Sequence, residues 1–197
     1  MKYQELSYKF LTLADELVNK GYWICDHILD KKDFENLLRY FDNRLHQFSP
    51  AKIGRGLEKS LNHDLRSDQI LWLEDSDQNL VSYFDIMNHI QDILKKELFL
   101  PIKNYETQMA WYGPGASYTR HRDRHKNSDA RCVSSVFYMN EGWNFEDGGQ
   151  LLIQTQSKEV SVEPVANRLV IFKSELEHEV LVSNKNRKSL ATWFRVD

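Results

Sequence analysis

Apolar residues recur at helical spacing through the first hundred residues, and this pattern predicts three helices. The first helix is expected over residues 6–18, and Gly21 stands where a glycine typically ends a helix. The second helix is expected over residues 31–45, and the third over residues 83–98, before Pro101.

Strands are expected after residue 101, where apolar residues fall into short segments rich in aromatic and β-branched side chains. Turn-forming stretches with glycine, proline or asparagine separate these segments. Such a series is typical of an antiparallel barrel or a double-sheet jelly roll, here with the N-terminal helices packed on one sheet. The expected fold class is therefore α+β. The predicted strands span residues 70–73, 109–112, 117–121, 132–140, 150–153, 168–172, 178–182 and 188–196.

Length and composition indicate one domain. The chain has 197 residues, within the usual size of a single domain, and its 41% hydrophobic and 28% charged residues exclude a disordered chain. We expect residues 1–100 to be mainly helical support, with a polar, mobile loop at residues 52–64. Residues 101–197 are expected to form the strand-rich core.

Apolar runs, cysteine content and net charge limit the cellular compartment and the kinds of binding partner that we expect. No apolar run exceeds four residues, so neither a membrane span nor a secretory signal is expected. The two cysteines, Cys25 and Cys132, are too few for a disulfide framework and favour the cytoplasm. The net charge is −3, with 26 basic against 29 acidic residues, which disfavours a nucleic-acid partner.

Candidate chemistry begins with His121 and Asp123, which share one face if they lie on a strand. With 7 histidines in 197 residues, chance alone gives about half such a pair per chain, so a surface ion pair remains the simpler interpretation. His178 would complete two histidines and one carboxylate, a facial triad with three open positions, as in non-haem Fe(II) oxygenases. A structural zinc site prefers four closed ligands. His125 is an alternative third ligand.

Arg187 adds a second element to this candidate site. If residues 183–186 form a four-residue turn, His178 pairs with Ala191 and faces the same side as Arg187, about 13 Å away along the sheet. A five-carbon dicarboxylate that chelates the metal would then place its far carboxylate under the guanidinium, which binds carboxylates bidentately. The alternative is a solvated turn residue.

Residues 109–197 resemble the catalytic core of the prolyl hydroxylase domain group of Fe(II)- and 2-oxoglutarate-dependent dioxygenases, including its bacterial members. The stretches 53–56 and 66–72 resemble the loop and strand that these enzymes place beside the substrate. The matched motifs are Tyr112-Gly113-Pro114-Gly115, Tyr118-Thr119-Arg120-His121-Arg122-Asp123, Arg131-Cys132-Val133, Phe137-Tyr138-Met139-Asn140 with Trp143, Asp147-Gly148-Gly149-Gln150-Leu151, Glu163-Pro164, Arg168-Leu169-Val170-Ile171-Phe172, His178-Glu179-Val180, and Arg187 followed by Thr192-Trp193-Phe194.

The resemblance implies a double-stranded β-helix, which is a jelly roll, and a metal-dependent oxidation. The cofactors it implies are Fe(II), 2-oxoglutarate as cosubstrate and O₂, with ascorbate as a supporting reductant and with succinate and CO₂ released. The implied iron ligands are His121, Asp123 and His178. Arg187 and Tyr138 are implied to bind the far carboxylate of 2-oxoglutarate, with Tyr112 near its chelating end.

The resemblance also implies a prolyl residue of a protein or peptide as the substrate, with translation elongation factor Tu as one candidate. We expect the enzyme to act as a monomer. The residues implied to face the substrate are Arg131, Arg55, Arg66, Asp68 and Trp193. From the residues alone, Arg66 and Asp68 are equally well explained as a local salt bridge, and Trp193 as a core tryptophan.

Two features depart from the family's pattern. Residues 124–130 are charged and one residue longer than in the animal members, and Ala191 stands where a hydroxyl side chain is expected. Two alternatives stay open: the same oxygenase chemistry on a nucleobase or small molecule, and a jelly-roll binding module without turnover.

Overall fold

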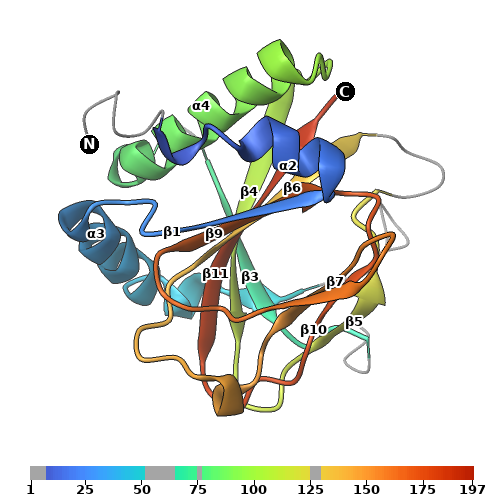
Figure 1. Ribbon diagram of the computed structural model, residues 1–197. Coiled ribbons are helices and arrows are strands. Elements are labelled where there is room, and N and C mark those ends of the chain that lie inside the picture. The colour runs from blue at the N-terminus through green and yellow to red at the C-terminus, as the bar shows by residue number, and fades with distance from the viewer. Residues whose placement is uncertain (1–7, 52–64, 75–76, 125–129) are drawn as a thin grey trace.

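The computed structural model describes residues 8–51, 65–74, 77–124 and 130–197. Within these residues the strands form two antiparallel sheets, and Figure 1 shows α2 and α4 on the side of the larger sheet that faces away from the smaller one. The larger sheet has seven strands in the order β1-β9-β6-β11-β4-β3-β2, and the smaller has four in the order β5-β10-β7-β8. The expected α+β class with a jelly-roll core is confirmed.

Short strands build both sheets. The larger sheet contains β1 (Tyr22–Asp26), β2 (Ser49–Pro50), β3 (Gln69–Leu73), β4 (Asn104–Tyr112), β6 (Arg131–Tyr138), β9 (Arg168–Lys173) and β11 (Arg187–Arg195). The smaller sheet contains β5 (Tyr118–His121), β7 (Leu151–Gln154), β8 (Glu159–Val162) and β10 (His178–Val180). The helices are α2 (Leu13–Asn19), α3 (Lys31–Asp42) and α4 (Val81–Glu97), with 3₁₀ turns η1 (Leu45–Gln47), η3 (Gln78–Leu80) and η4 (Phe145–Asp147).

The observed helix bounds correct two predictions. The helix expected over residues 6–18 is interrupted: residues 8–9 are helical, residues 10–12 form a turn, and α2 begins at Leu13, while residues 1–7 lie outside the described part of the chain. Gly21 follows this helix with φ +83°, as its predicted role requires. Helix α3 begins after Asp30, whose carboxylate accepts a first-turn backbone N–H. It ends at residue 42, so Leu45 lies in η1 and not on the helix.

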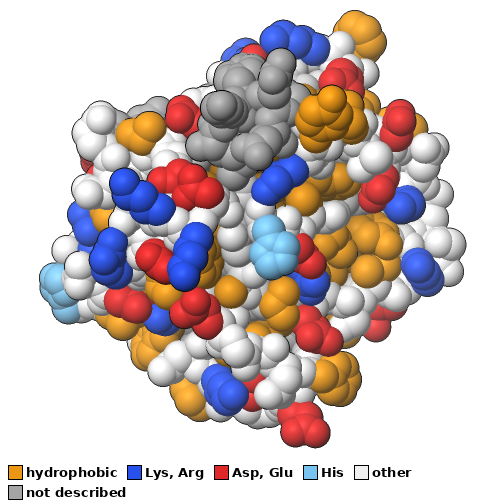
Figure 2. Space-filling view, turned by 60° about the vertical axis from the view of Figure 1, so that its left-hand side comes forward, with side chains coloured by type: hydrophobic (Ala, Val, Ile, Leu, Met, Phe, Trp, Pro, Cys, Tyr) orange, Lys and Arg blue, Asp and Glu red, His pale blue; other side chains and the backbone are white. Residues whose placement is uncertain are grey.

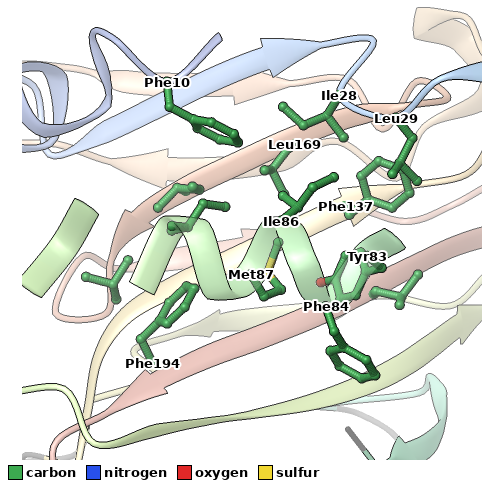
Figure 3. Packing of buried hydrophobic residues seen from close by; sticks show 14 of the residues in the cluster. Phe10, Ile28, Leu29, Tyr83, Phe84, Ile86, Met87, Phe137, Leu169 and Phe194 are labelled. Carbon is green, nitrogen blue, oxygen red and sulfur yellow. The ribbon is translucent and has the colours of Figure 1, made fainter. Parts of the chain in front are cut away.

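The larger hydrophobic core lies between the helices and the outer face of the seven-stranded sheet. Figure 3 shows α4 packing its apolar face against this sheet, with Tyr83 beside Phe137 of β6. The two ring centres are 5.9 Å apart. Each large apolar side chain buried in this way contributes about 1.5–3 kcal/mol. The predicted apolar face of the third helix is therefore confirmed as a core face.

A second core fills the space between the two sheets and forms the surroundings of the candidate site. Successive residues of a strand face opposite sides, so Phe137 points toward the helices and Tyr138 toward this inner core. Ile153 of the smaller sheet and Phe172 of the larger sheet are both buried there, at 0% and 1% exposure.

Three strands escaped the sequence pattern, and one predicted pairing is wrong. Strands β1, β2 and β8 were not predicted, and β4 begins at Asn104 rather than at residue 109. The expected hairpin between residues 178–182 and 187–196 does not form. Strand β10 pairs with β5 and β7, whereas β11 pairs with β4 and β6.

The connection between β10 and β11 shows why the hairpin fails. Ser183 donates its backbone N–H to Ala116 and accepts one from Gly115, and Val182 accepts one from Gly149. These bonds to two neighbouring turns carry the chain from the smaller to the larger sheet.

No helix among the described residues is both long and apolar enough to cross a membrane.

Candidate metal centre

Two histidines and one aspartate lie together at one end of the smaller sheet. His121 is the last residue of β5, and His178 is the first residue of β10 and stands opposite it. Asp123 follows β5 rather than lying on it, so the shared strand face that would have joined His121 and Asp123 does not exist, although the predicted strand end at residue 121 is correct. One possible ligand atom from each residue lies within 4.8 Å of the others. The sequence therefore located this cluster, although its argument from a shared strand face does not apply to Asp123.

Backbone carbonyls orient both imidazole rings. Nδ1 of His121 lies 2.8 Å from the carbonyl oxygen of Thr119, and Nδ1 of His178 lies 2.9 Å from that of Leu176. A carbonyl oxygen only accepts, so each Nδ1 carries a proton and each Nε2 is the nitrogen left to bind a metal ion. Nε2 of His121 and of His178 lie 3.9 and 3.4 Å from oxygens of Asp123. The donor atoms converge as a metal ion requires.

The pKa shifts of His121 and Asp123 suit a divalent cation, whereas at His178, whose pKa is raised, a metal ion has to displace a proton. Burial, and then the neighbouring His178, lower the pKa of His121 to about 3, so its ring is neutral at neutral pH. Burial alone would raise the pKa of Asp123, but His178, His121 and Arg131 outweigh it and hold the pKa below its usual range. Burial would lower the pKa of His178, but Asp123 raises it overall.

Arg187 begins β11 and is only 1% exposed. Its Nε donates to the carbonyl of Gly149 at 2.9 Å, and its Nη1 to the Ser189 hydroxyl at 3.2 Å. Its guanidinium carbon lies 4.8 and 5.0 Å from the ring centres of Tyr112 and Tyr138. Among the described residues, no carboxylate forms an ion pair with it. A buried cation without an anion is costly, so this position calls for an anionic ligand.

The hydroxyl of Tyr138 supports the same conclusion. It is fully buried, and it has no hydrogen-bond partner among the residues that the structure describes. A buried hydroxyl without a partner is rare and costs about 1–3 kcal/mol. It lies beside the unneutralised Arg187, and a carboxylate bound there would satisfy both groups.

A cavity of about 300 Å³ joins the two parts of the site. The three proposed ligands line it from the smaller sheet and from the segment that follows β5. Arg187 and Tyr112 line it from the larger sheet. His178 and Arg187 therefore face each other across the space between two sheets. The sequence analysis expected them on neighbouring strands of one sheet.

The predicted substrate-facing residues fall into two groups around this cavity. Arg131 and Trp193 form one wall, with the guanidinium carbon 3.9 Å from the indole ring centre. Arg131 also bonds to Glu106 at 2.8 Å and approaches Asp123 at 3.8 Å. Trp72 lies in the stretch 66–72 that the resemblance places beside the substrate; it is 49% exposed, and its ring centre is 6.0 Å from that of Trp193.

Arg66 and Asp68 form the second group, joined by two bonds of 2.6 and 2.9 Å. The pair is not a simple surface salt bridge, because Asp68 is 2% exposed and Arg66 lines the cavity. Arg55 and His125 lie outside the described residues, as does the loop expected at residues 52–64.

Sequence analysis also missed two supporting hydroxyls. Ser134 donates to an oxygen of Asp123 at 2.7 Å, and no sequence pattern signals this contact. Ser189 accepts from Arg187 at 3.2 Å, and their i, i+2 spacing on one strand would have placed both on one face.

A jelly roll with two histidines, a carboxylate and a buried, unneutralised arginine around one cavity defines a non-haem iron oxygenase that takes an anionic cosubstrate. A model of the 2OG-Fe(II) oxygenase superfamily matches residues 107–195. The crystal structure of a Pseudomonas putida prolyl-4-hydroxylase is 35% identical, covering 94% of this chain and 100% of that chain, with a TM-score of 0.85. The chain belongs to the 2OG-Fe(II) oxygenase superfamily and to its prolyl hydroxylase type.

Curated relatives agree with this assignment. The hypoxia-inducible factor prolyl hydroxylase of Caenorhabditis elegans is 27% identical over 195 residues, which cover 88% of this chain and 26% of that protein. Egl nine homolog 1 of Mus musculus is 30% identical over 143 residues, which cover 66% of this chain and 35% of that protein. The chain thus spans about a quarter to a third of these two proteins. Enzymes of this superfamily use Fe(II), 2-oxoglutarate and O₂.

Proposed function

We propose that this chain hydroxylates a prolyl residue of a protein or peptide and converts 2-oxoglutarate and O₂ to succinate and CO₂. The observation that carries the proposal is the buried Arg187, which has no anionic partner among the described residues and lines the same cavity as the histidine–aspartate cluster. A dicarboxylate fits both ends of that cavity, because one end binds metal and the other is cationic.

The chain's own residues would hold the iron and 2-oxoglutarate in fixed orientations. His121, Asp123 and His178 would bind Fe(II) through two Nε2 atoms and one carboxylate, leaving three positions open. Arg187 and the Tyr138 hydroxyl would bind the far carboxylate of 2-oxoglutarate. When bound, iron and 2-oxoglutarate supply the O₂-dependent oxidation that places a hydroxyl on an unactivated carbon.

Two observations support a peptide substrate. The P. putida relative is a prolyl-4-hydroxylase, and a Trichoplax adhaerens prolyl hydroxylase with a TM-score of 0.87 and 24% identity was solved with a hypoxia-inducible factor peptide. Trp193 lines the cavity of this chain, and the half-exposed Trp72 packs beside Trp193; both are flat apolar surfaces suited to a proline ring. Elongation factor Tu is the candidate substrate that we would test first.

A nucleic-acid substrate is less well supported. Figure 2 shows acidic and basic side chains interleaved on the face drawn there, and the described side chains form no large patch of a single positive sign on it. A phosphate backbone favours a continuous basic surface instead. The net charge of −3 agrees with this.

An anaerobic titration tests the cofactor part of the proposal. Fe(II) followed by 2-oxoglutarate should give a saturable visible charge-transfer band in the wild-type protein. His121→Ala should abolish the band. Arg187→Ala should retain metal binding but lose about 100-fold or more in 2-oxoglutarate affinity, since breaking a buried ion pair costs about 3–5 kcal/mol. Undiminished cosubstrate affinity in this variant contradicts the assignment, and Arg39→Ala on the exposed face of α3 is the matched control.

A product assay tests the substrate part. Proline-containing peptides of elongation factor Tu are incubated with the loaded enzyme, with alanine-substituted peptides and a methylated oligonucleotide alongside. The proposal requires a gain of one oxygen atom at proline, with one succinate formed for each hydroxylation. Turnover of the oligonucleotide alone would contradict prolyl hydroxylation and support a nucleobase substrate instead. Metal binding without any succinate would leave the binding-module alternative.

A further inference from the structure

Charged residues alternate with the proposed iron ligands on both segments that carry them. Residues 120–124 read Arg-His-Arg-Asp-Arg, and residues 175–179 read Glu-Leu-Glu-His-Glu. The proposed ligands face the cavity, and Leu176 packs against the inner core. The side chains of the intervening arginines and glutamates are 24–57% exposed, and Arg120 and Arg122 are also among the residues that line the cavity.

The strand register brings these charges into pairs. His121 stands opposite His178 in the antiparallel pairing of β5 with β10, and a bulge follows His178. If the same antiparallel register is continued beyond His121, Arg122 stands opposite Glu177 and Arg124 stands opposite Glu175. We call the three cross-strand ion pairs the Arg–Glu ladder; its N···O distances are 2.5 Å for Arg120–Glu179, 3.1 Å for Arg122–Glu177 and 3.7 Å for Arg124–Glu175.

Two of the three ladder pairs lie where the strand pairing has already ended. Strand β5 ends at His121, so Asp123 has no partner in the β5–β10 pairing. One backbone bond continues there, from Arg124 N–H to the Ser174 carbonyl at 3.0 Å. The two outer ion pairs bracket Asp123 and join its segment to the residues just before His178.

We propose that the Arg–Glu ladder is a positioning device that holds His121 and Asp123 in register with His178 for metal binding. The inference rests on the proposed function, because it assumes that these residues bind the metal. An isolated exposed ion pair contributes little to folding stability. A metal site is more demanding, since its ligands must stay within about 0.5 Å of their productive positions.

The decisive experiment separates positioning from simple charge attraction. Mn(II) binding is measured by calorimetry in the wild-type protein, in Arg122→Gln and in Glu177→Gln. Charge attraction alone predicts opposite effects, because loss of an arginine strengthens cation binding and loss of a glutamate weakens it. Positioning predicts that both variants bind Mn(II) more weakly, by about threefold to fivefold at low salt. Opposite effects of the two variants overturn the proposal.

A charge swap provides the rescue. The double variant Arg122→Glu with Glu177→Arg keeps the net charge and rebuilds the ion pair in reverse. It should bind Mn(II) within about twofold of the wild type, whereas affinity as weak as that of the single variants contradicts the ladder. The differences should also shrink at about 1 M salt, where the Debye length falls to about 3 Å.

Two controls keep the ladder and the metal site distinguishable. Lys96→Gln breaks an exposed pair with Asp92 on α4 and should leave Mn(II) affinity unchanged. The metal-free unfolding midpoint of every variant is measured as well. A drop in stability without a change in affinity gives the ladder a merely structural role and overturns the proposal. Failure of the wild-type protein to bind Mn(II) instead overturns the proposed metal site itself.

Discussion

Gly149 packs directly against Arg187. The variant Gly149→Ala tests whether this close contact sets the position of the guanidinium in the proposed 2-oxoglutarate site. Gly149 has φ +66°, a conformation that alanine adopts at a cost of about 1 kcal/mol. A Cβ atom added there would lie 2.9 Å from Cδ of Arg187 and 3.1 Å from the hydroxyl oxygen of Ser183. The same glycine accepts the Nε–H bond of Arg187 through its carbonyl. We therefore expect the Arg187 side chain to move away from the added methyl group, which displaces its guanidinium.

This shift predicts two measurable losses. The backbone cost and the close contact together should lower the free energy of unfolding by about 2–3 kcal/mol, which lowers the melting temperature by about 4–12 °C in a chain of this size. A displaced guanidinium should lose about 1–2 kcal/mol of its bond with the far carboxylate, so 2-oxoglutarate affinity should fall about tenfold. Calorimetric titration of the Mn(II)-loaded protein measures the affinity.

Gly142→Ala is the matched control, because Gly142 has a similar φ of +62° and no atom within 4 Å of an added Cβ. It should carry only the backbone cost, about 1 kcal/mol, with 2-oxoglutarate affinity unchanged. If folded Gly149→Ala binds 2-oxoglutarate as tightly as this control, the close contact does not set the position of Arg187 and the reasoning is refuted.

Two further predictions follow from single side chains. Tyr138→Phe should lower 2-oxoglutarate affinity about tenfold. In urea unfolding the metal-free variant should be as stable as the wild type or more stable, because the substitution removes a buried hydroxyl that has no partner among the described residues. A loss of stability contradicts the assignment. Hydrogen bonding from Arg168 lowers the pKa of Asp26, so this carboxylate stabilises the fold above its unfolded pKa of about 3.9 and loses that effect as the pH falls further. Asp26→Asn should therefore be less stable than the wild type at pH 7, with the gap closing by about pH 2–3 in urea unfolding; a gap that widens toward acid contradicts this linkage.

Sequence reasoning located the site although two steps of its geometric argument do not hold, the strand face shared by His121 and Asp123 and the hairpin joining His178 to Arg187. The i, i+2 spacing of His121 and Asp123 and the later His178 were enough to suggest a metal cluster. The inferred link from His178 to Arg187 relied on a hairpin that does not form. Only long-range backbone bonds, such as that from Ser183 to Ala116, show that the chain changes sheets there, and no local pattern encodes them. The two residues nevertheless line one cavity, because the sheets face each other.

The Arg–Glu ladder shows a second limit of sequence reasoning. Taken one at a time, Glu177 and Glu179 are ordinary exposed charges, and the sequence analysis had no partner for either. Their alternation with His178 becomes meaningful only when the register with β5 is known. Strand β8 was missed for a related reason, since Glu159–Val162 offers only two apolar residues to a pattern that needs more.

The architecture divides the proposed site between its two sheets, and this fixes what the cavity can accept. The metal cluster lies at the end of β5 and β10 in the smaller sheet, whereas Arg187 and Tyr138 belong to the larger sheet. Facing sheets pack about 10 Å apart, a spacing set by the side chains between them, here including Ile153 and Phe172. The separation of metal and guanidinium is thus a property of the inner core and not of any single strand. A ligand must span from one sheet to the other to satisfy both ends, so the same packing that stabilises the jelly roll also selects the length of the dicarboxylate.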